Sequence, residues 1–276
     1  MRSTAGPAQP VPSYVRAEGG VRVAFAATGR GTRALTVAES GGYRLRFPRA
    51  EGSACEAVLI NTGGGMAGGD RMNVAAELGE GADALLTTQA AEKVYRSDGP
   101  DTAVAVTLDL AAASRLAWLP QETILFDRAR FSRRLDVRMA ADATLTLAES
   151  IVFGRLAMGE VVADAAFADR WRIGRGGALV FAEDVRLSGD VAARLDRPAV
   201  GKGARALATV LHVAPGAEAR LDEARAALEG SACEAGASAW NGLLLVRLLS
   251  PDAHALRRAL VSFLERFRGR PMPRSW

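Results

Sequence analysis

Short apolar or alternating runs, separated by glycine, proline and aspartate, recur through most of this 276-residue chain. Such runs are typical of β-strands, because successive side chains of a strand point to opposite faces. In Val104–Leu110, for example, every second residue is aliphatic and falls on one face. The predicted strands are Val21–Ala27, Tyr43–Phe47, Glu56–Ile60, Met72–Leu78, Ala84–Thr88, Val104–Leu110, Phe131–Met139, Thr144–Leu147, Ala178–Phe181 and Leu207–Val213.

These runs predict a mainly β fold and leave a sandwich, a barrel and a coil of strands open. No clean repeat with a period of roughly 20 to 50 residues stands out, so the residues alone do not indicate a solenoid. The interior shows neither a linker nor a shift in composition. We therefore expect a single domain over residues 1–276, with residues 1–17 as a flexible lead-in.

Two helices are expected near the C-terminus. Ser250-Pro251-Asp252 is a start signal, with the Ser250 hydroxyl as N-cap. The following leucines and phenylalanines recur every three or four residues and form one stripe that Gly269 ends. The stripe consists of Leu256, Leu260, Phe263 and Phe267.

The second helix is predicted at Leu221–Leu228, with Gly230 as its C-terminal cap. Between the two helices, Ala239–Leu249 is expected to be a buried strand that carries Trp240.

Charge and cysteine content narrow the classes of function. The net charge is only +4, and arginines alternate with acidic residues along the chain, so a nucleic-acid interface is not expected. No apolar run approaches the ~20 residues that cross a bilayer, so we expect no membrane span. Cys55 and Cys233 are far apart in sequence and are expected to be packed, reduced thiols in a cytoplasmic protein.

The densest motif is the glycine-rich segment Asn61–Asp70. Gly63, Gly65 and Gly68 match the spacing of a dinucleotide-binding fingerprint, but that site requires a helix to follow at once. Here an alternating strand, Met72–Leu78, follows instead. The segment is therefore interpreted as a turn in which two backbone segments pass closely.

Catalytic and metal motifs are weak. The only histidines are His212, in a strand pattern, and His254, at the start of the last helix, and no zinc-type spacing or nucleophile elbow occurs. What remains is a set of carboxylates near glycines and aromatic residues. Paired carboxylates can serve a glycosidase, so a carbohydrate-active β-fold enzyme and a generic protein-binding adaptor stay as alternatives. These carboxylates are Asp70, Glu92, Glu122, Glu149, Glu160 and Glu183.

Several of these segments, in this order, resemble the UreD (also called UreH) family of urease accessory proteins. The resemblance covers the chain from about residue 18 to its end. One departure is Arg274-Ser275-Trp276, because the family more often has an apolar residue before the tryptophan. The resemblance rests on Asn61–Asp70, Leu86–Ser97, Trp118–Phe126, Glu149–Glu160, Arg170–Ile173, Trp240–Gly242 with Arg247, Gly269–Pro271 and Pro273–Trp276.

The resemblance implies a β-helix-like stack of short strands with two helices near the C-terminus. It also implies a protein that is not an enzyme. Its role would be to join apo-urease to UreF and to the GTPase UreG, in an assembly that delivers nickel to urease. The C-terminal helices would then meet UreF, with Phe263, Phe267 and Arg270 as candidate partner-binding residues.

The scarcity of cysteine and histidine suits a protein that passes Ni²⁺ onward, because nitrogen and sulfur ligands would hold that ion tightly. Our hypothesis is a passage through the strand stack, lined by carboxylates that bind the ion loosely. We expect no tightly bound cofactor. The candidate ligands are Asp70, Glu149 and Glu183, with Asp70 favoured because of the glycines around it.

Overall fold

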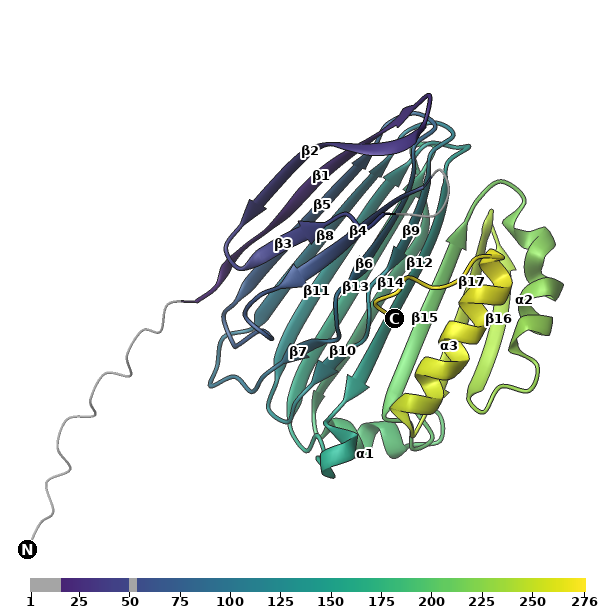
Figure 1. The fold of residues 1–276 in the computed structure, drawn as a ribbon. Coiled ribbons are helices and arrows are strands. Elements are labelled where there is room, and N and C mark those ends of the chain that lie inside the picture. The colour runs from purple at the N-terminus through teal and green to yellow at the C-terminus, as the bar shows by residue number, and fades with distance from the viewer. Residues whose placement is uncertain (1–15, 50–53) are drawn as a thin grey trace, which may run out of the picture.

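The structure is a computed structural model that describes residues 16–49 and 54–276, so most of the expected lead-in (1–17) lies outside the described residues. Two β-sheets face each other, and helices lie beside one of them (Figure 1). A large apolar core, which includes Val74, Leu108 and Leu135, fills the space between the sheets. The prediction of a mainly β fold is confirmed.

The first sheet has seven strands, and its central strands are parallel. Antiparallel strands flank this parallel block at both edges. In spatial order the strands are β14 (Ala178–Gly189), β13 (Ala165–Arg175), β11 (Arg130–Met139), β8 (Thr102–Leu110), β5 (Arg71–Leu78), β1 (Glu18–Thr28) and β2 (Gly31–Ser40).

The second sheet has ten strands and a parallel block of its own, formed by β4, β6, β9 and β12. Two short strands, β7 (Glu92–Val94) and β10 (Thr123–Leu125), extend it beside β12. The main order is β16 (Glu234–Trp240), β17 (Leu243–Ser250), β15 (Ala206–Val213), β12 (Thr144–Phe153), β9 (Arg115–Leu119), β6 (Asp83–Thr88), β4 (Cys55–Asn61) and β3 (Tyr43–Arg46).

From β4 to β13 the chain passes repeatedly from one sheet to the other, which makes a β-solenoid of about four turns. Parallel register stacks like on like: Val74 pairs with Val106, and Val106 pairs with Leu135. Each rung thus buries its inward face on its neighbours. The stack of strands implied by the family resemblance is confirmed, although the sequence shows no repeat period that predicts a solenoid.

The described residues contain three α-helices. The two expected near the C-terminus are α2 (Leu221–Leu228) and α3 (Ala253–Arg268). The third, α1 (Val191–Asp196), was not expected; the carboxylate of Asp190 caps it by accepting from the amide of Ala193. Among the described residues, no helix has the length and the apolar character needed to span a bilayer.

Helix α3 begins two residues later than predicted. Its N-cap is Asp252, whose carboxylate accepts from the amide of His254, whereas Ser250 is the last residue of β17. Both side chains accept from nearby amides, and the acidic one also complements the positive end of the helix dipole. The helix ends as predicted, with Gly269 in the left-handed conformation.

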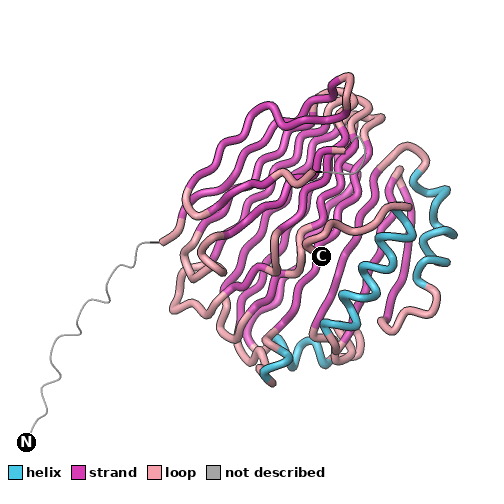
Figure 2. The backbone as a smooth tube through the Cα atoms, viewed as in Figure 1, coloured by secondary structure: helices cyan, strands magenta, loops and turns pink. Residues whose placement is uncertain are grey.

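Helix α3 lies along the outer face of the ten-stranded sheet (Figure 2), and its apolar stripe belongs to a second apolar core there. Phe263 and Phe267 are 0% and 1% exposed and stack on each other with 5.4 Å between ring centroids. Trp276 is anchored nearby, because its indole N–H donates to Thr87 and to the carbonyl of Leu119. The unusual Arg-Ser-Trp ending is therefore accommodated.

The predicted buried strand Ala239–Leu249 is wrong. The segment is a hairpin in which β16 ends at Trp240 and β17 starts at Leu243. Asn241 and Gly242 between them have φ of 50° and 74°, as a two-residue hairpin turn requires. Trp240 is 37% exposed at the sheet edge rather than buried.

Candidate functional site

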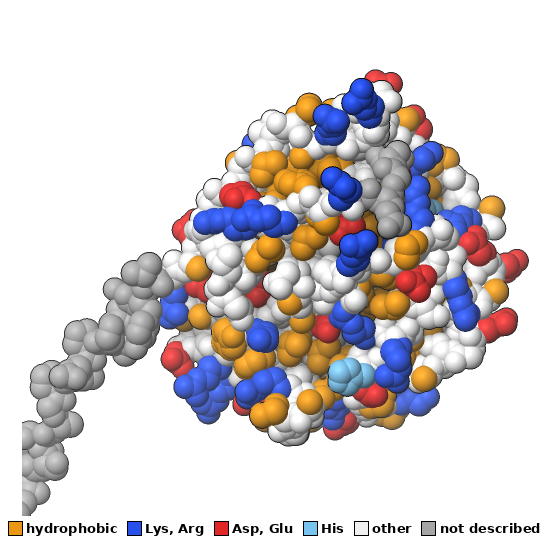
Figure 3. Space-filling view, in the orientation of Figure 1, with side chains coloured by type: hydrophobic (Ala, Val, Ile, Leu, Met, Phe, Trp, Pro, Cys, Tyr) orange, Lys and Arg blue, Asp and Glu red, His pale blue; other side chains and the backbone are white. Residues whose placement is uncertain are grey.

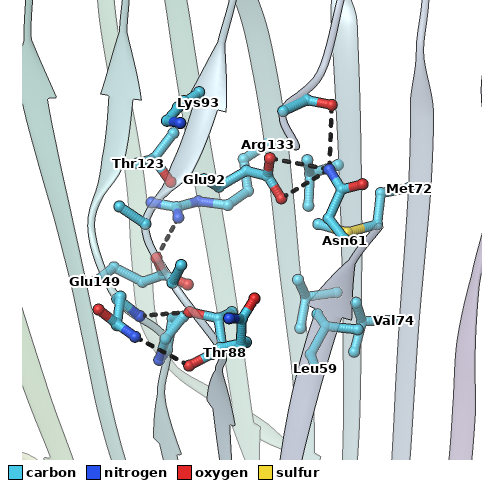
Figure 4. A pocket seen from close by; sticks show the side chains of 18 of the residues that line it. Leu59, Asn61, Met72, Val74, Thr88, Glu92, Lys93, Thr123, Arg133 and Glu149 are labelled. Atoms are coloured by element: carbon cyan, nitrogen blue, oxygen red, sulfur yellow. Dashed lines mark hydrogen bonds and ion pairs between the residues drawn. The ribbon is translucent and has the colours of Figure 1, made fainter. Parts of the chain in front are cut away.

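Two cavities lie between the sheets. Cavity 1, of about 230 Å³, has apolar walls such as Met72 and Val106 and polar groups at Asn61 and Glu92 (Figure 4). Cavity 2, of about 250 Å³, lies further along the stack and includes Glu183 in its wall.

Arg133 and Glu149 line both cavities, so these two side chains mark the place where the cavities meet. Arg133 lies on β11 and pairs in register with Asp169 on β13, while Glu149 reaches in from β12 of the opposite sheet. The three side chains, hereafter the Arg133 cluster, are 4%, 7% and 4% exposed for Arg133, Asp169 and Glu149. Charges buried this deeply require partners.

The Arg133 cluster is fully hydrogen-bonded. Arg133 donates from Nε to Asp169 Oδ1 at 3.0 Å and from Nη2 to Asp169 Oδ2 at 2.5 Å, and its Nη1 donates to Glu149 Oε2. Two indoles complete the set: Trp118 donates to Glu149 Oε1 at 2.8 Å, and Trp171 donates to Asp169 Oδ1 at 2.9 Å. The guanidinium thus ties the two sheets together.

Burial and pairing act in opposite directions on these groups. Burial raises the pKa of Glu149, and the Arg133 charge and the Trp118 hydrogen bond offset part of that rise. Burial alone would lower the pKa of Arg133, but Asp169 and Glu149 outweigh it and raise that pKa. Arg133 therefore stays charged, and the formal charges of one arginine and two carboxylates sum to −1.

Glu183, on β14, lies in the wall of cavity 2. Its Oε1 accepts from Arg247 on β17 at 2.7 Å, a contact that links the two sheets. Its Oε2 is buried and has no hydrogen-bond partner. Of the three predicted nickel ligands, the structure thus places Glu149 and Glu183 in one cavity.

Asp70 is held elsewhere. Its two carboxylate oxygens accept from the amides of Ala17 at 2.8 Å and Ala67 at 2.7 Å, which closes the glycine-rich turn. It does not line cavity 1 or cavity 2. Asp70 was favoured as a ligand because the glycines leave the backbone around it open. In the structure, backbone amides in this region donate to its carboxylate instead.

Glu92 is a further carboxylate of cavity 1. Asn61 donates from Nδ2 to both of its oxygens, at 3.0 and 3.2 Å, and also to the carbonyl of Gly65 (Figure 4). Burial raises the pKa of Glu92 to about 7, although Asn61 and Lys93 partly oppose the shift. The glycine-rich turn is thereby joined to the cavity wall by one amide side chain.

The other carboxylates singled out in the sequence form ion pairs. Glu122 pairs with Arg257 of α3 at 2.5 Å, and Glu160 pairs with Arg155 at 2.9 Å. Hydrogen bonds from Arg155 lower the pKa of Glu160. The first contact joins α3 to the segment before β10, the second closes the loop after β12, and neither glutamate lines cavity 1 or cavity 2.

The histidines do not form a metal site. His212 is buried with its Nδ1 3.0 Å from Thr146 Oγ1, and burial followed by the charge of Arg220 lowers its pKa to about 4. His254 is exposed at the first turn of α3. Within residues 16–49 and 54–276, no group of three or more histidine, cysteine or acidic side chains is arranged to hold a metal ion.

The predicted partner-binding residues divide into two kinds. Phe263 and Phe267 lie inside the core beneath α3, whereas the side chain of Arg270 is 55% exposed and 3.5 Å from Asp83. Charged side chains of both signs are interspersed over the face that carries α3 (Figure 3). Any partner on this side meets a mixed, arginine-rich surface rather than the phenylalanine stripe.

Sequence reasoning missed Arg133, Asp169 and their two tryptophans. A signal was present, because Arg133 occupies an inward position of the alternating run Phe131–Met139. Asp169 likewise occupies an inward position of β13, between the buried Phe167 and Trp171. A charged residue in the buried phase of a strand predicts a buried ion pair.

Known proteins of similar sequence agree with the family resemblance described above. A family model described as "UreD urease accessory protein" matches residues 17–276. The "Urease accessory protein UreD" of Methylobacterium sp. (strain 4-46) is 56% identical over 276 residues, covering 97% of this chain and 98% of the relative. Proteins with the same description from Xanthobacter autotrophicus (53% identical; 95% and 90% covered) and Azorhizobium caulinodans (49%; 96% and 98%) are also similar.

Members of this family are non-catalytic accessory proteins, in agreement with the expectation that the chain is not an enzyme. A match over almost the whole described chain, together with relatives of about half-identical sequence, shows the family. The chain belongs to the UreD urease accessory protein family and takes part in urease maturation.

Proposed function

We propose that this protein acts in the cytoplasm as a scaffold that joins apo-urease to UreF and the GTPase UreG. In the same assembly it gives Ni²⁺ a route toward the urease active site. The route is the pair of cavities between the sheets, with Glu149 at their junction and Glu183 in the wall of cavity 2. Nickel is the cargo of this passage and not a resident cofactor.

The observation that carries this proposal is the junction itself. Two cavities of similar size share a buried carboxylate, and a second carboxylate with one unpartnered oxygen lies in the wall of the second cavity. Isolated carboxylates bind Ni²⁺ weakly compared with histidine or cysteine clusters, which suits an ion in transit. Asp70 is not included, because both of its oxygens already bind the turn.

The partner surface is proposed on the side of α3. Phe263 and Phe267 fix the helix to the sheet from inside, and exposed groups such as Arg270 would contact UreF. Arginine suits such a role because its planar group binds carboxylates in fixed geometry.

The test compares E149Q, E183Q and the double variant with D109N, which changes a partly exposed carboxylate of the outer sheet face paired with Arg138. Urease is matured in cells that carry each variant, and its nickel content is measured after purification. Co-purification of the variant with UreF and apo-urease is measured in parallel.

We expect E149Q/E183Q to assemble normally but to lower the nickel content of urease several-fold, and D109N to leave it unchanged. Full nickel loading with the assembled double variant would reject the passage. A chain whose deletion leaves urease fully active would be a generic adaptor instead.

A further inference from the structure

Arg133 occupies an unexpected place for a route that carries cations. Its guanidinium is 4% exposed and lines both cavities, so a positive charge stands where the cavities meet. A divalent cation at Glu149 would come within contact range of that charge, because Arg133 Nη1 donates directly to Glu149 Oε2. Two cations close together at low dielectric repel each other strongly.

Arg133 makes more hydrogen bonds to Asp169 than to Glu149. It donates twice to Asp169, in the side-by-side geometry that binds a carboxylate firmly, but only once to Glu149. Each carboxylate has an indole donor of its own, Trp118 for Glu149 and Trp171 for Asp169. Arg133 can therefore release Glu149 by losing one hydrogen bond while Asp169 and the indoles keep every other bond in place.

We propose that Arg133 is a gate that competes with the transported divalent cation for Glu149. In the closed state, the one described here, Arg133 occupies Oε2 of Glu149. In the open state the bond from Arg133 Nη1 to Glu149 is broken while both bonds to Asp169 remain, and the cation binds Glu149. This inference rests on the proposed passage and adds to it the residue that controls the step between the cavities.

Charge explains why the ion would not stay. The Arg133 cluster has a net charge of −1, so a divalent cation brings it to +1. The return of Arg133 toward Glu149 then displaces the ion. Glu183 receives it in cavity 2, where Oε2 is buried without a hydrogen-bond partner and only Oε1 is taken by Arg247.

Two variants of the full-length chain test the gate in opposite directions. R133M/D169N removes the competitor together with one carboxylate, so the net charge of the cluster stays at −1. D169N removes the negative charge and one of the two acceptor oxygens that hold Arg133 on Asp169, so Arg133 binds Glu149 more firmly. R133K, which retains the positive charge, is the matched control.

The measurement is calorimetric titration of each purified protein with NiCl2, after circular dichroism has confirmed the fold. We expect R133M/D169N to bind Ni²⁺ at least tenfold more tightly than the natural chain, and D169N to bind it several-fold more weakly. R133K should stay within about threefold of the natural chain. Adding E149Q to R133M/D169N should abolish the gain.

The gate is overturned if R133M/D169N binds Ni²⁺ no more tightly than the natural chain, or if its gain survives E149Q. Should R133M/D169N fail to fold, unchanged affinity in D169N overturns it instead. Failure of the passage is a separate result, because it appears as full nickel loading of urease with E149Q/E183Q. A passage without a gate would lose loading in E149Q/E183Q while R133M/D169N kept the natural affinity.

Discussion

Glu92 is the residue whose protonation the structure perturbs near neutral pH. Burial raises its pKa from 4.5 to about 7, so the folded protein binds more protons than the unfolded chain between those values. The stability that this proton contributes is complete below pH 4.5 and is lost as the pH rises through 7. Asn61 Nδ2 donates to both oxygens of the ionised carboxylate and to the carbonyl oxygen of the neutral acid, so one of the two hydrogen bonds is kept on protonation.

We predict that E92Q removes the loss of stability that accompanies ionisation of Glu92. Relative to E92Q, the natural chain should lose free energy of unfolding between pH 5 and 7, with a slope of at most ~1.4 kcal/mol per pH unit. Urea unfolding at pH 5, 6 and 7 measures the difference, with E80Q at an exposed turn as the control for a lost carboxylate. A constant difference between the natural chain and E92Q would contradict the assigned environment of Glu92.

At this scale the sequence predicted part of the site. Glu149 and Glu183 were selected as acidic residues near glycines and strands, and both line cavity 2. Arg133 and Asp169 were missed, because each is one charge among many in an arginine-rich chain. Their pairing depends on parallel register between β11 and β13, which local patterns do not determine.

Among the elements, α3 shows how an amphipathic stripe is used. Its five buried residues include Phe263 and Phe267, which close one side of a second apolar core on the outer face of the ten-stranded sheet. Arg220 lies over the ring of Phe267, 3.8 Å from its centroid, and so connects the end of this helix to α2. The stripe is internal packing, which leaves the opposite face of α3 for the proposed contact with UreF.

F263A should therefore destabilise the protein by about 3–5 kcal/mol, because truncating a fully buried phenylalanine leaves a cavity. R258A, an exposed change on the same helix, should stay within about 0.5 kcal/mol of the natural chain. Chemical denaturation of both variants measures the effect. Equal stability of F263A and R258A would mean that α3 is not docked as described.

Helices and strands were predictable from the sequence where burial of one face makes the apolar residues recur at a regular spacing. Val104–Leu110 and Leu221–Leu228 were both identified, and their observed bounds are Thr102–Leu110 and Leu221–Leu228. Strand β2 was missed because it lies at a sheet edge with exposed side chains such as Leu35 and Val37, so it lacks an inward face. The hairpin at Asn241 was missed because apolar residues on both sides concealed its turn.

At the scale of the whole molecule, the stack of two sheets determines which inward side chains meet. Parallel rungs place inward side chains from successive turns at the same level, as with Arg133 on β11 and Asp169 on β13, and the facing sheet brings Glu149 on β12 against them. The sequence predicted the mainly β class and the C-terminal helices, and the family resemblance supplied the stacked architecture. The facing of the sheets, and hence the cavities between them, depends on packing that no local pattern specifies.

Movement of an ion through these cavities can be tested by obstructing them. Ala90 and Val200 line cavities 1 and 2 at exposed positions, so A90W and V200W fill the openings and leave every carboxylate in place. A112W, at an exposed turn, is the control for an added indole. The nickel content of urease matured with each variant is measured alongside assembly of the complex. We expect A90W and V200W to assemble but to deliver several-fold less nickel than A112W, and equal nickel content with all three would contradict an ion passage through the cavities.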